Sequence, residues 1–136
     1  MTVKQTLKRA AFKTILRAMA PAFNLACRIY PRVAERLKEH DCVVQLKLVD
    51  GSIARFLTFE GGRVSSNAGM HSDANVCMSF IDVDAALDLL MPPQDRAKIV
   101  HAAKNFRAMM DGDDALINWF MQLTNLMQTE GLKRGT

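Results

Sequence analysis

Hydrophobic and polar residues alternate along the middle of the chain, between residues 43 and 81. An alternation with a period of two is typical of β-strands that bury one face, so Gln45 and Lys47 are expected to face water. The pattern predicts strands at 43–49, 52–60, 63–69 and 74–81. Asp50-Gly51 and Gly61-Gly62 separate the first three strands, and both pairs are favoured in two-residue hairpin turns because glycine accepts a positive φ. A sheet is therefore expected at the centre of the chain.

The residues before this sheet repeat with a helical period. Residues 3–20 are expected to form an amphipathic helix. Pro21 and Pro31 lack the amide N–H that a helix interior needs, but proline fits the first turn of a helix. We therefore expect these prolines to begin two further short helical segments, at 21–30 and 32–39.

The residues after the sheet predict a helix, a short strand and a final helix. The first helix covers 83–91, where Asp82 caps it and Pro92-Pro93 ends it. One or two helical turns are expected over 94–104, and a fifth strand over 106–110. The final helix covers 114–128, after Asp113 as N-cap, and Gly131 is expected to end it.

The charge of the chain is unevenly distributed. The 136 residues carry a formal net charge of +4 and suggest one domain. Residues 1–38 hold nine Lys or Arg and one acid, whereas residues 39–136 hold nine basic residues and thirteen acids. Such a basic block favours an anionic partner: a phospholipid surface, a nucleic acid or an acidic protein. We expect no nucleic-acid partner, since few aromatic residues are interleaved and no nucleic-acid-binding motif occurs.

Two interpretations of the first helix stay open. A basic amphipathic helix is typical of a protein that lies on an anionic membrane surface. Alternatively, its apolar face packs on its own sheet while the cations face water. On the first interpretation, the membrane-docking residues are Arg9, Phe12, Lys13, Leu16 and Arg17.

The chain offers no recognisable catalytic or metal-binding motif. Its three cysteines form no CxxC pair, which indicates neither a disulfide framework nor a zinc site and fits a reducing, cytoplasmic location. The three histidines have no ligand spacing, and the acids at 111–114 are explained by helix capping. No apolar run is long enough to span a membrane, and no secretory signal is expected. We expect no cofactor, no metal and no enzymatic activity.

The order of elements resembles the sterol carrier protein 2 family of lipid-binding domains. The residues that carry the likeness are Leu46-Lys47-Leu48-Val49-Asp50-Gly51, Gly61-Gly62, the stretch 72–80, and Gly112-Asp113 before the last helix. The resemblance implies an α+β fold, with a five-stranded antiparallel sheet covered by helices and an apolar tunnel between them. It covers about residues 32–128 and implies a lipid-binding domain at 32–136, preceded by an added basic amphipathic helical arm at 1–31. The basic arm and the longer link at 92–105 depart from the family pattern.

The resemblance implies that the protein binds a sterol, a fatty acyl chain or another lipid, and transfers or presents it at a membrane. Nine methionines fit this interpretation, because Met suits a surface that accepts a flexible apolar ligand, although core filling explains them equally well. The expected lining residues are Phe56, Phe59, Met78, Phe80, Leu87, Leu90, Met109, Phe120, Leu123 and Met127.

Three alternatives remain. The protein is an accessory factor that holds a hydrophobic intermediate of ubiquinone or other prenyl-lipid biosynthesis, or it is an interaction subunit whose Met-rich groove takes a partner helix. The third, least favoured alternative is an enzyme acting on a lipid or acyl-CoA through His71 or the acids at 111–114.

Overall fold

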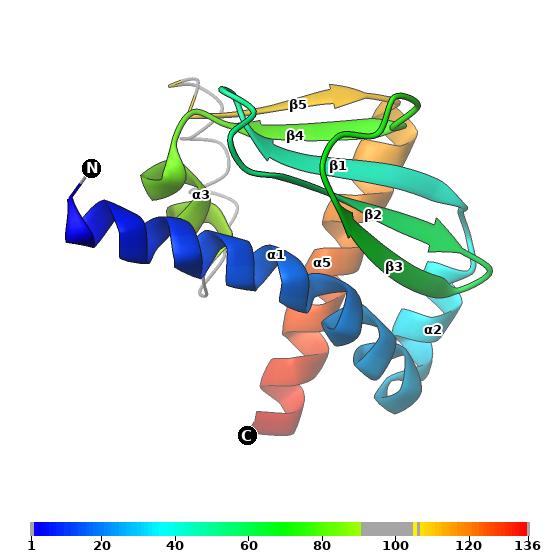
Figure 1. Cartoon of the computed structure of the whole chain (residues 1–136). Coiled ribbons are helices and arrows are strands. Elements are labelled where there is room, and N and C mark those ends of the chain that lie inside the picture. Colours follow the sequence, from blue (N-terminus) through cyan, green and yellow to red (C-terminus); the bar gives the residue numbers. More distant parts are fainter. Residues whose placement is uncertain (1, 91–104, 106, 136) are drawn as a thin grey trace.

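The computed structural model describes residues 2–90, 105 and 107–135 of the chain. Five strands form one sheet in the order β3-β2-β1-β4-β5 (Figure 1). The strands are β1 (Cys42–Leu48), β2 (Ala54–Glu60), β3 (Arg63–Ala68), β4 (Val76–Phe80) and β5 (Ala108–Gly112). The described helices are α1 (Val3–Ile29), α2 (Pro31–Leu37), α3 (Val83–Leu90) and α5 (Asp114–Gly135). The expected α+β class with a five-stranded sheet is confirmed.

The sheet is mixed, so the prediction of a purely antiparallel sheet is wrong at one pair. Strands β1 and β4 are parallel, with Val44 opposite Val76 and Leu48 opposite Phe80. The other three pairs are antiparallel. The chain leaves β3 at one side of the sheet and crosses the sheet before β4 begins beside the start of β1. A connection of this kind yields a parallel neighbour, whereas a tight hairpin yields an antiparallel one.

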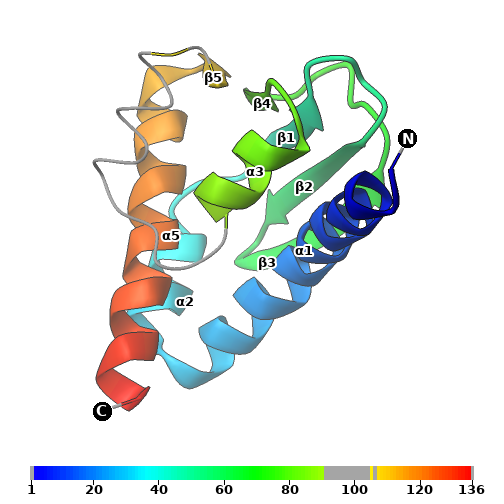
Figure 2. The ribbon, with the colours of Figure 1, turned by 90° about the vertical axis from the view of Figure 1, so that its left-hand side faces the viewer.

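The described helices lie on one side of the sheet (Figure 1). Figure 2 shows α1 and α5 diverging toward the sheet, with α3 between them. The strand positions that face these helices are apolar and fully buried, as at Val44, Leu46 and Leu57. The opposite face of the sheet carries no described helix (Figures 1 and 2).

Helix α1 continues through Pro21, which corrects the expected break there. A proline inside a helix removes one hydrogen bond, the bond to the carbonyl four residues earlier. Pro21 and Arg17 are both exposed, so water can reach the freed carbonyl group of Arg17. The break at the second proline is confirmed, because Tyr30 is extended and Pro31 begins α2.

The two glycine turns behave differently. Glu60 pairs with Arg63, and Gly61 and Gly62 have φ of 58° and 81°, so the expected two-residue hairpin is confirmed. Between β1 and β2 the turn is longer than the expected Asp50-Gly51 pair, because the Leu48 N–H bonds to the Ile53 carbonyl. Four residues, 49–52, therefore lie between Leu48 and Ile53, the last hydrogen-bonded pair of this hairpin.

The remaining elements lie close to their expected positions. Strand β5 begins two residues later than predicted, at Ala108, and α5 continues past Gly131. The helical turns expected over 94–104 lie outside the described residues. Helix α1 contributes Phe12, Leu16 and Phe23 to the same core as the sheet, so residues 3–29 pack against the remainder of the chain.

Candidate functional site

A small apolar hollow lies between α1, α3 and α5, where Figure 2 shows the three helices in proximity. It has a volume of about 170 Å³. We call it the interhelix hollow. Its lining residues are Ile15, Met19, Ala22, Phe23, Leu90, Thr124 and Met127. Six of these seven side chains are apolar, so the hollow suits hydrocarbon.

The ten lining residues expected from the sequence fall into three groups. Leu90 and Met127 line the interhelix hollow. Met78 and Leu87 are partly buried against the core. Four residues are fully buried within the core: Phe59, Phe80, Phe120 and Leu123. The structure thus brings these eight residues to the helix side of the sheet.

Phe56 and Met109 lie on the opposite face of the sheet, which corrects their assignment to the same lining. Phe56 pairs with Gln45 and Met109 pairs with Ser79, and neither position belongs to the inward set of Val44, Leu46 and Leu48. The Phe56 ring instead packs edge-on against the ring of His71, with 4.9 Å between centroids. The sequence misled for Phe56 because β2 carries apolar residues on both faces.

The core beneath the interhelix hollow is filled by aromatic side chains. The Phe23 ring lies 5.6 Å from that of Phe59 and 6.3 Å from that of Phe120, measured between centroids. The Phe12 ring lies 5.9 Å from that of Phe80. Pockets that enclose a drug-sized ligand usually measure about 300–1,000 Å³, so the interhelix hollow admits only part of a lipid in this conformation.

The methionines do not gather into one groove in the described structure. Met19 and Met127 line the interhelix hollow, whereas Met70 and Met109 are exposed on other surfaces. The expected Met-rich groove for a partner helix is therefore not formed by these side chains together. Met19 was missed by the sequence argument, although its position on the apolar side of the first helix was visible.

Phe12 and Leu16 are not available to a membrane in this conformation, which corrects their assignment as docking residues. They are 0% and 1% exposed, and the Phe12 ring packs on Phe80. Lys13 and Arg17 are exposed, and Arg9 is half-buried. The apolar face of α1 thus packs on its own sheet, as the second interpretation of this helix held.

A different row of apolar side chains on α1 faces the solvent. We call it the outer strip: Val3, Leu7, Leu25 and Ile29, which are 78%, 66%, 57% and 40% exposed. Because an α-helix has 3.6 residues per turn, these four positions share one side of α1. The sequence argument did not identify the outer strip.

Polar contacts fix α1 to its neighbours near both ends. Lys8 forms an ion pair with Asp84 of α3, and this contact lowers the pKa of the Asp84 carboxyl. Near the other end, the Asn24 side-chain amide donates to the Val64 carbonyl (2.8 Å) and accepts from the Val64 N–H (3.0 Å). The Asn24 side chain therefore donates to and accepts from the backbone of edge strand β3, as the backbone of a neighbouring strand would.

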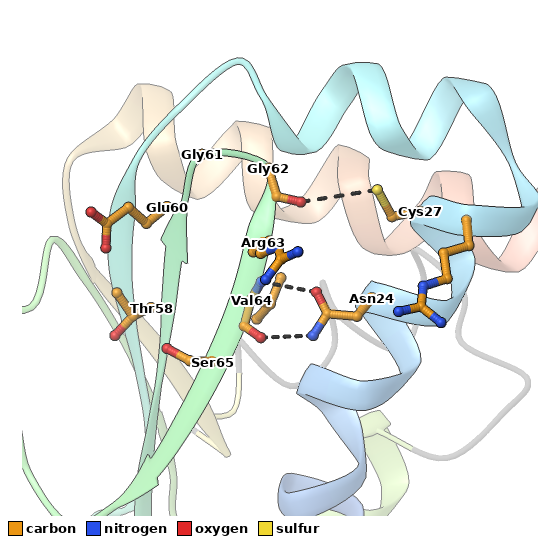
Figure 3. Close-up of a pocket in the computed structure, with 10 residues that line it drawn as sticks. Asn24, Cys27, Thr58, Glu60, Gly61, Gly62, Arg63, Val64 and Ser65 are labelled. Atoms are coloured by element: carbon orange, nitrogen blue, oxygen red, sulfur yellow. Dashed lines mark hydrogen bonds between the residues drawn. The ribbon is translucent and has the colours of Figure 1, made fainter.

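Asn24 also stands at a second, larger hollow of about 790 Å³ around the β2–β3 hairpin (Figure 3). Figure 3 shows the Asn24 amide facing β3, while Thr58 and Glu60 project on the far side of the hairpin. The Cys27 thiol lies 3.9 Å from the Gly62 carbonyl oxygen. This concavity therefore wraps around a strand edge and offers no apolar enclosure comparable to the interhelix hollow.

The described residues contain no group of three His, Cys, Asp or Glu that could hold a metal ion. Burial raises the pKa of the Cys42 thiol to about 11, with a smaller contribution from the charge of Asp41. That thiol is therefore protonated at neutral pH and is a poor nucleophile. Within the described chain, none of the helices has the length and apolar character of a membrane span.

Comparison with known proteins adds evidence on the fold. No family model matches the chain, and no curated protein matches it. A structure named as the UbiJ-SCP2 ubiquinone synthesis protein aligns with a TM-score of 0.52 and 17% identity, over 95% of this chain and 97% of that chain. Sterol carrier protein 2 like 2 from Aedes aegypti aligns with a TM-score of 0.46 and 17% identity, over 70% and 92% of the two chains.

A third similar structure is a double mutant of the sec-alkyl sulfatase PisA1, with a TM-score of 0.51 and 16% identity. The alignment covers 71% of this chain and 16% of the sulfatase, so the chain spans a small part of that enzyme. The end-to-end alignment with UbiJ-SCP2 defines the class: this chain has the sterol carrier protein 2-like fold. The resemblance noted in the sequence is thereby confirmed for the fold.

Proposed function

We propose that this protein binds the hydrocarbon part of a lipid at the interhelix hollow and that it does so without catalysing a reaction. The observation that carries the proposal is the apolar lining shared by α1, α3 and α5, in a fold built like sterol carrier protein 2. The hollow opens directly onto Phe23, which belongs to the aromatic core. Separation of the helices would extend the hollow toward that core.

Burial of hydrocarbon supplies the affinity. Each buried CH₂ group contributes about 0.8 kcal/mol, so eight such groups contribute roughly 6 kcal/mol before the costs of association. The interhelix hollow is too small for a whole lipid, so binding requires the side chains of Met19, Leu90 and Met127 to move aside. Methionine suits this role because its side chain is unbranched and flexible.

A hydrophobic precursor of a prenyl quinone is the second candidate ligand. The alignment with the ubiquinone synthesis protein UbiJ-SCP2 runs over nearly the whole of both chains, α1 included, and this favours it. On this proposal the protein holds the precursor for other enzymes. A sterol or a fatty acyl chain fits the same apolar lining, and lipid extraction distinguishes these ligands.

We propose further that α1 docks on an anionic membrane through the outer strip rather than through Phe12 and Leu16. The outer strip is apolar and exposed, and the exposed cations Lys13 and Arg17 lie on the same helix. A basic residue near an anionic leaflet contributes about 1 kcal/mol. Docking in this manner leaves the core packing of α1 intact and keeps the mouth of the interhelix hollow beside the membrane-facing helix.

Lipid binding is tested by filling the interhelix hollow. Ala22 lines the hollow yet is exposed, so Ala22→Phe adds a ring there without overpacking the core. The matched control is Ala115→Phe, at an exposed alanine of α5 that does not line the hollow. We expect cis-parinaric acid to bind Ala22→Phe at least about tenfold more weakly than the wild type, a change that matches the loss of about two buried CH₂ groups. Equal affinity in both variants would refute this site.

Docking is tested by vesicle co-sedimentation. The double substitution Leu7→Glu/Leu25→Glu removes apolar contact and adds negative charge at exposed positions, so the fold is retained. The control is Met70→Glu, which is 56% exposed and lies outside α1. We expect the double variant to lose binding to phosphatidylglycerol-containing vesicles and the control to keep it, with binding of the wild type weakened by salt. Unchanged binding of the double variant would refute docking through the outer strip.

A further inference from the structure

A third hollow, of about 220 Å³ and lined by cations, lies on the other flank of α1, between this helix and the start of β2. Lys13 and Arg17 reach it from α1, and Arg55 reaches it from β2. Ser52 stands at its rim, and the buried side chains of Leu16 and Ile53 contribute to its lining. We call it the cationic hollow.

The three cations of the cationic hollow have no carboxylate partner among the described residues, since the described ion pairs involve Lys8, Arg36 and Arg107. Lys13 and Arg17 are one helical turn apart, so their charges repel each other. Such unpaired like charges around a concavity attract an anion.

Arg55 is already oriented for such a ligand. Its Nε–H group donates to the Ser66 hydroxyl on β3, which leaves the two terminal nitrogens of the guanidinium group. A guanidinium group held in one orientation binds oxyanions through paired N–H donors, and it loses less entropy when it does so. Arg55 is half-buried, so its position depends on the sheet and not on a mobile surface chain.

The carboxylate of Asp50 lies at the rim of the cationic hollow, where, among the described residues, it bonds to Ser52 and to none of the three cations. Its Oδ1 accepts bonds from the Ser52 N–H (2.9 Å) and the Ser52 hydroxyl (2.7 Å). The charge of Arg9 also acts on Asp50. Among the described residues Asp50 forms no ion pair with Lys13, Arg17 or Arg55, so no carboxylate contact neutralises these three cations.

We propose that Lys13, Arg17 and Arg55 form a binding site for a phosphate group. Three cations more than neutralise a phosphate monoester, which carries about −1.5 to −2 charges at pH 7, and the paired donors of Arg55 match its oxygens. The volume of the cationic hollow suits a single headgroup, and its described lining includes no aromatic ring on which a nucleic-acid base could stack. The phosphate belongs either to a small soluble molecule or to the headgroup of a lipid.

The test compares Arg55→Gln with Arg63→Gln. Both variants remove one positive charge from the sheet, but Arg63 is exposed on β3 and does not line the cationic hollow. Inorganic phosphate and glycerol 3-phosphate are titrated into ¹⁵N-labelled protein, with the Arg55 Nε–H and the Ser52–Ala54 amides observed by NMR. The same variants are tested on phosphatidylcholine vesicles with and without phosphatidylglycerol.

We expect binding to weaken about tenfold in Arg55→Gln and less than twofold in Arg63→Gln. Arg55-dependent binding of the soluble phosphates assigns the site to a soluble ligand, and Arg55-dependent binding to vesicles alone assigns it to a headgroup. Equal behaviour of the two variants in both assays overturns the proposal, because the attraction is then a general effect of surface charge.

If Arg55→Gln does not fold, the double variant Lys13→Gln/Arg17→Gln replaces it, since both residues are exposed on α1. Its control is Arg28→Gln/Arg63→Gln, which removes the same charge outside the cationic hollow. Binding of cis-parinaric acid is measured alongside. It depends on the opposite flank of α1, so a failure of the phosphate site is distinguishable from a failure of lipid binding.

Discussion

Replacement of Asn24 by leucine tests how α1 is held against the sheet. The Asn24 amide makes two hydrogen bonds to the backbone of Val64, and both are lost in Asn24→Leu. Leucine has the same branched side-chain skeleton, with methyl groups in place of the amide oxygen and nitrogen, so the substitution removes the polar contact and keeps the shape of the side chain. Because α1 forms one wall of the interhelix hollow, this contact also limits how far that wall can move.

The magnitude follows from the two bonds. Each contributes about 1 kcal/mol net, and the Val64 N–H and carbonyl are left facing an apolar side chain. Asn24 is half-buried, so water compensates in part. We expect the free energy of unfolding to fall by about 2–3 kcal/mol, and Tm by roughly 8–12 °C for a chain of this length. Asn24→Asp keeps the acceptor and loses the donor, so about half of this loss is expected.

Urea unfolding followed by circular dichroism measures the change. The control is Asn118→Leu, at an exposed position of α5. It is expected to change stability by less than about 0.5 kcal/mol. The reasoning would be refuted if Asn24→Leu were as stable as this control, or if Asn24→Asp lost as much stability as Asn24→Leu.

Three further predictions concern single residues. Gly112 has φ of 124° and an added Cβ would lie 2.1 Å from a backbone oxygen, so Gly112→Ala should cost more than about 3 kcal/mol in urea unfolding, against about 1 for Gly51→Ala, where no atom lies within 4 Å. The bond from Lys8 lowers the pKa of Asp84, so its stabilisation is complete above the ordinary aspartate pKa and is lost as pH falls through the lowered value. The Tm difference between wild type and Asp84→Asn should therefore shrink to zero in acid. Burial raises the pKa of Cys42 to about 11, so mass spectrometry should find Cys42 unmodified by iodoacetamide at pH 8 in the native protein, and modified once urea unfolds it.

The sequence predicted the strands well because their pattern is local. The alternation of Val44, Leu46 and Leu48 and the glycines at 61 and 62 depend on near neighbours, and the structure confirms both. The parallel pairing of β1 with β4 was missed because it depends on the path of a loop. That loop also buries Gln45, which was expected to face water: its amide donates to the Gly69 carbonyl (2.9 Å) and accepts from the His71 N–H (2.8 Å).

The candidate sites were predicted less well, because helical periodicity shows which residues share a face but not what covers that face. The face of α1 that carries Phe12 and Leu16 packs against the protein core and does not face a membrane. Phe56 is apolar, but its neighbour across the sheet is Gln45 and not a core residue. The joining of Lys13 with Arg55 in one hollow depends on the packing of α1 against β2, which no local pattern encodes.

The most direct test of lipid binding is native mass spectrometry of the purified protein, followed by organic extraction and identification of the lipid. The account predicts a bound lipid or prenyl-quinone precursor in the wild type and in Ala115→Phe, and its loss from Ala22→Phe. An empty wild-type protein that also takes up no lipid from a panel of sterols, fatty acids and prenyl quinones would contradict the account, as would equal lipid content in all three proteins.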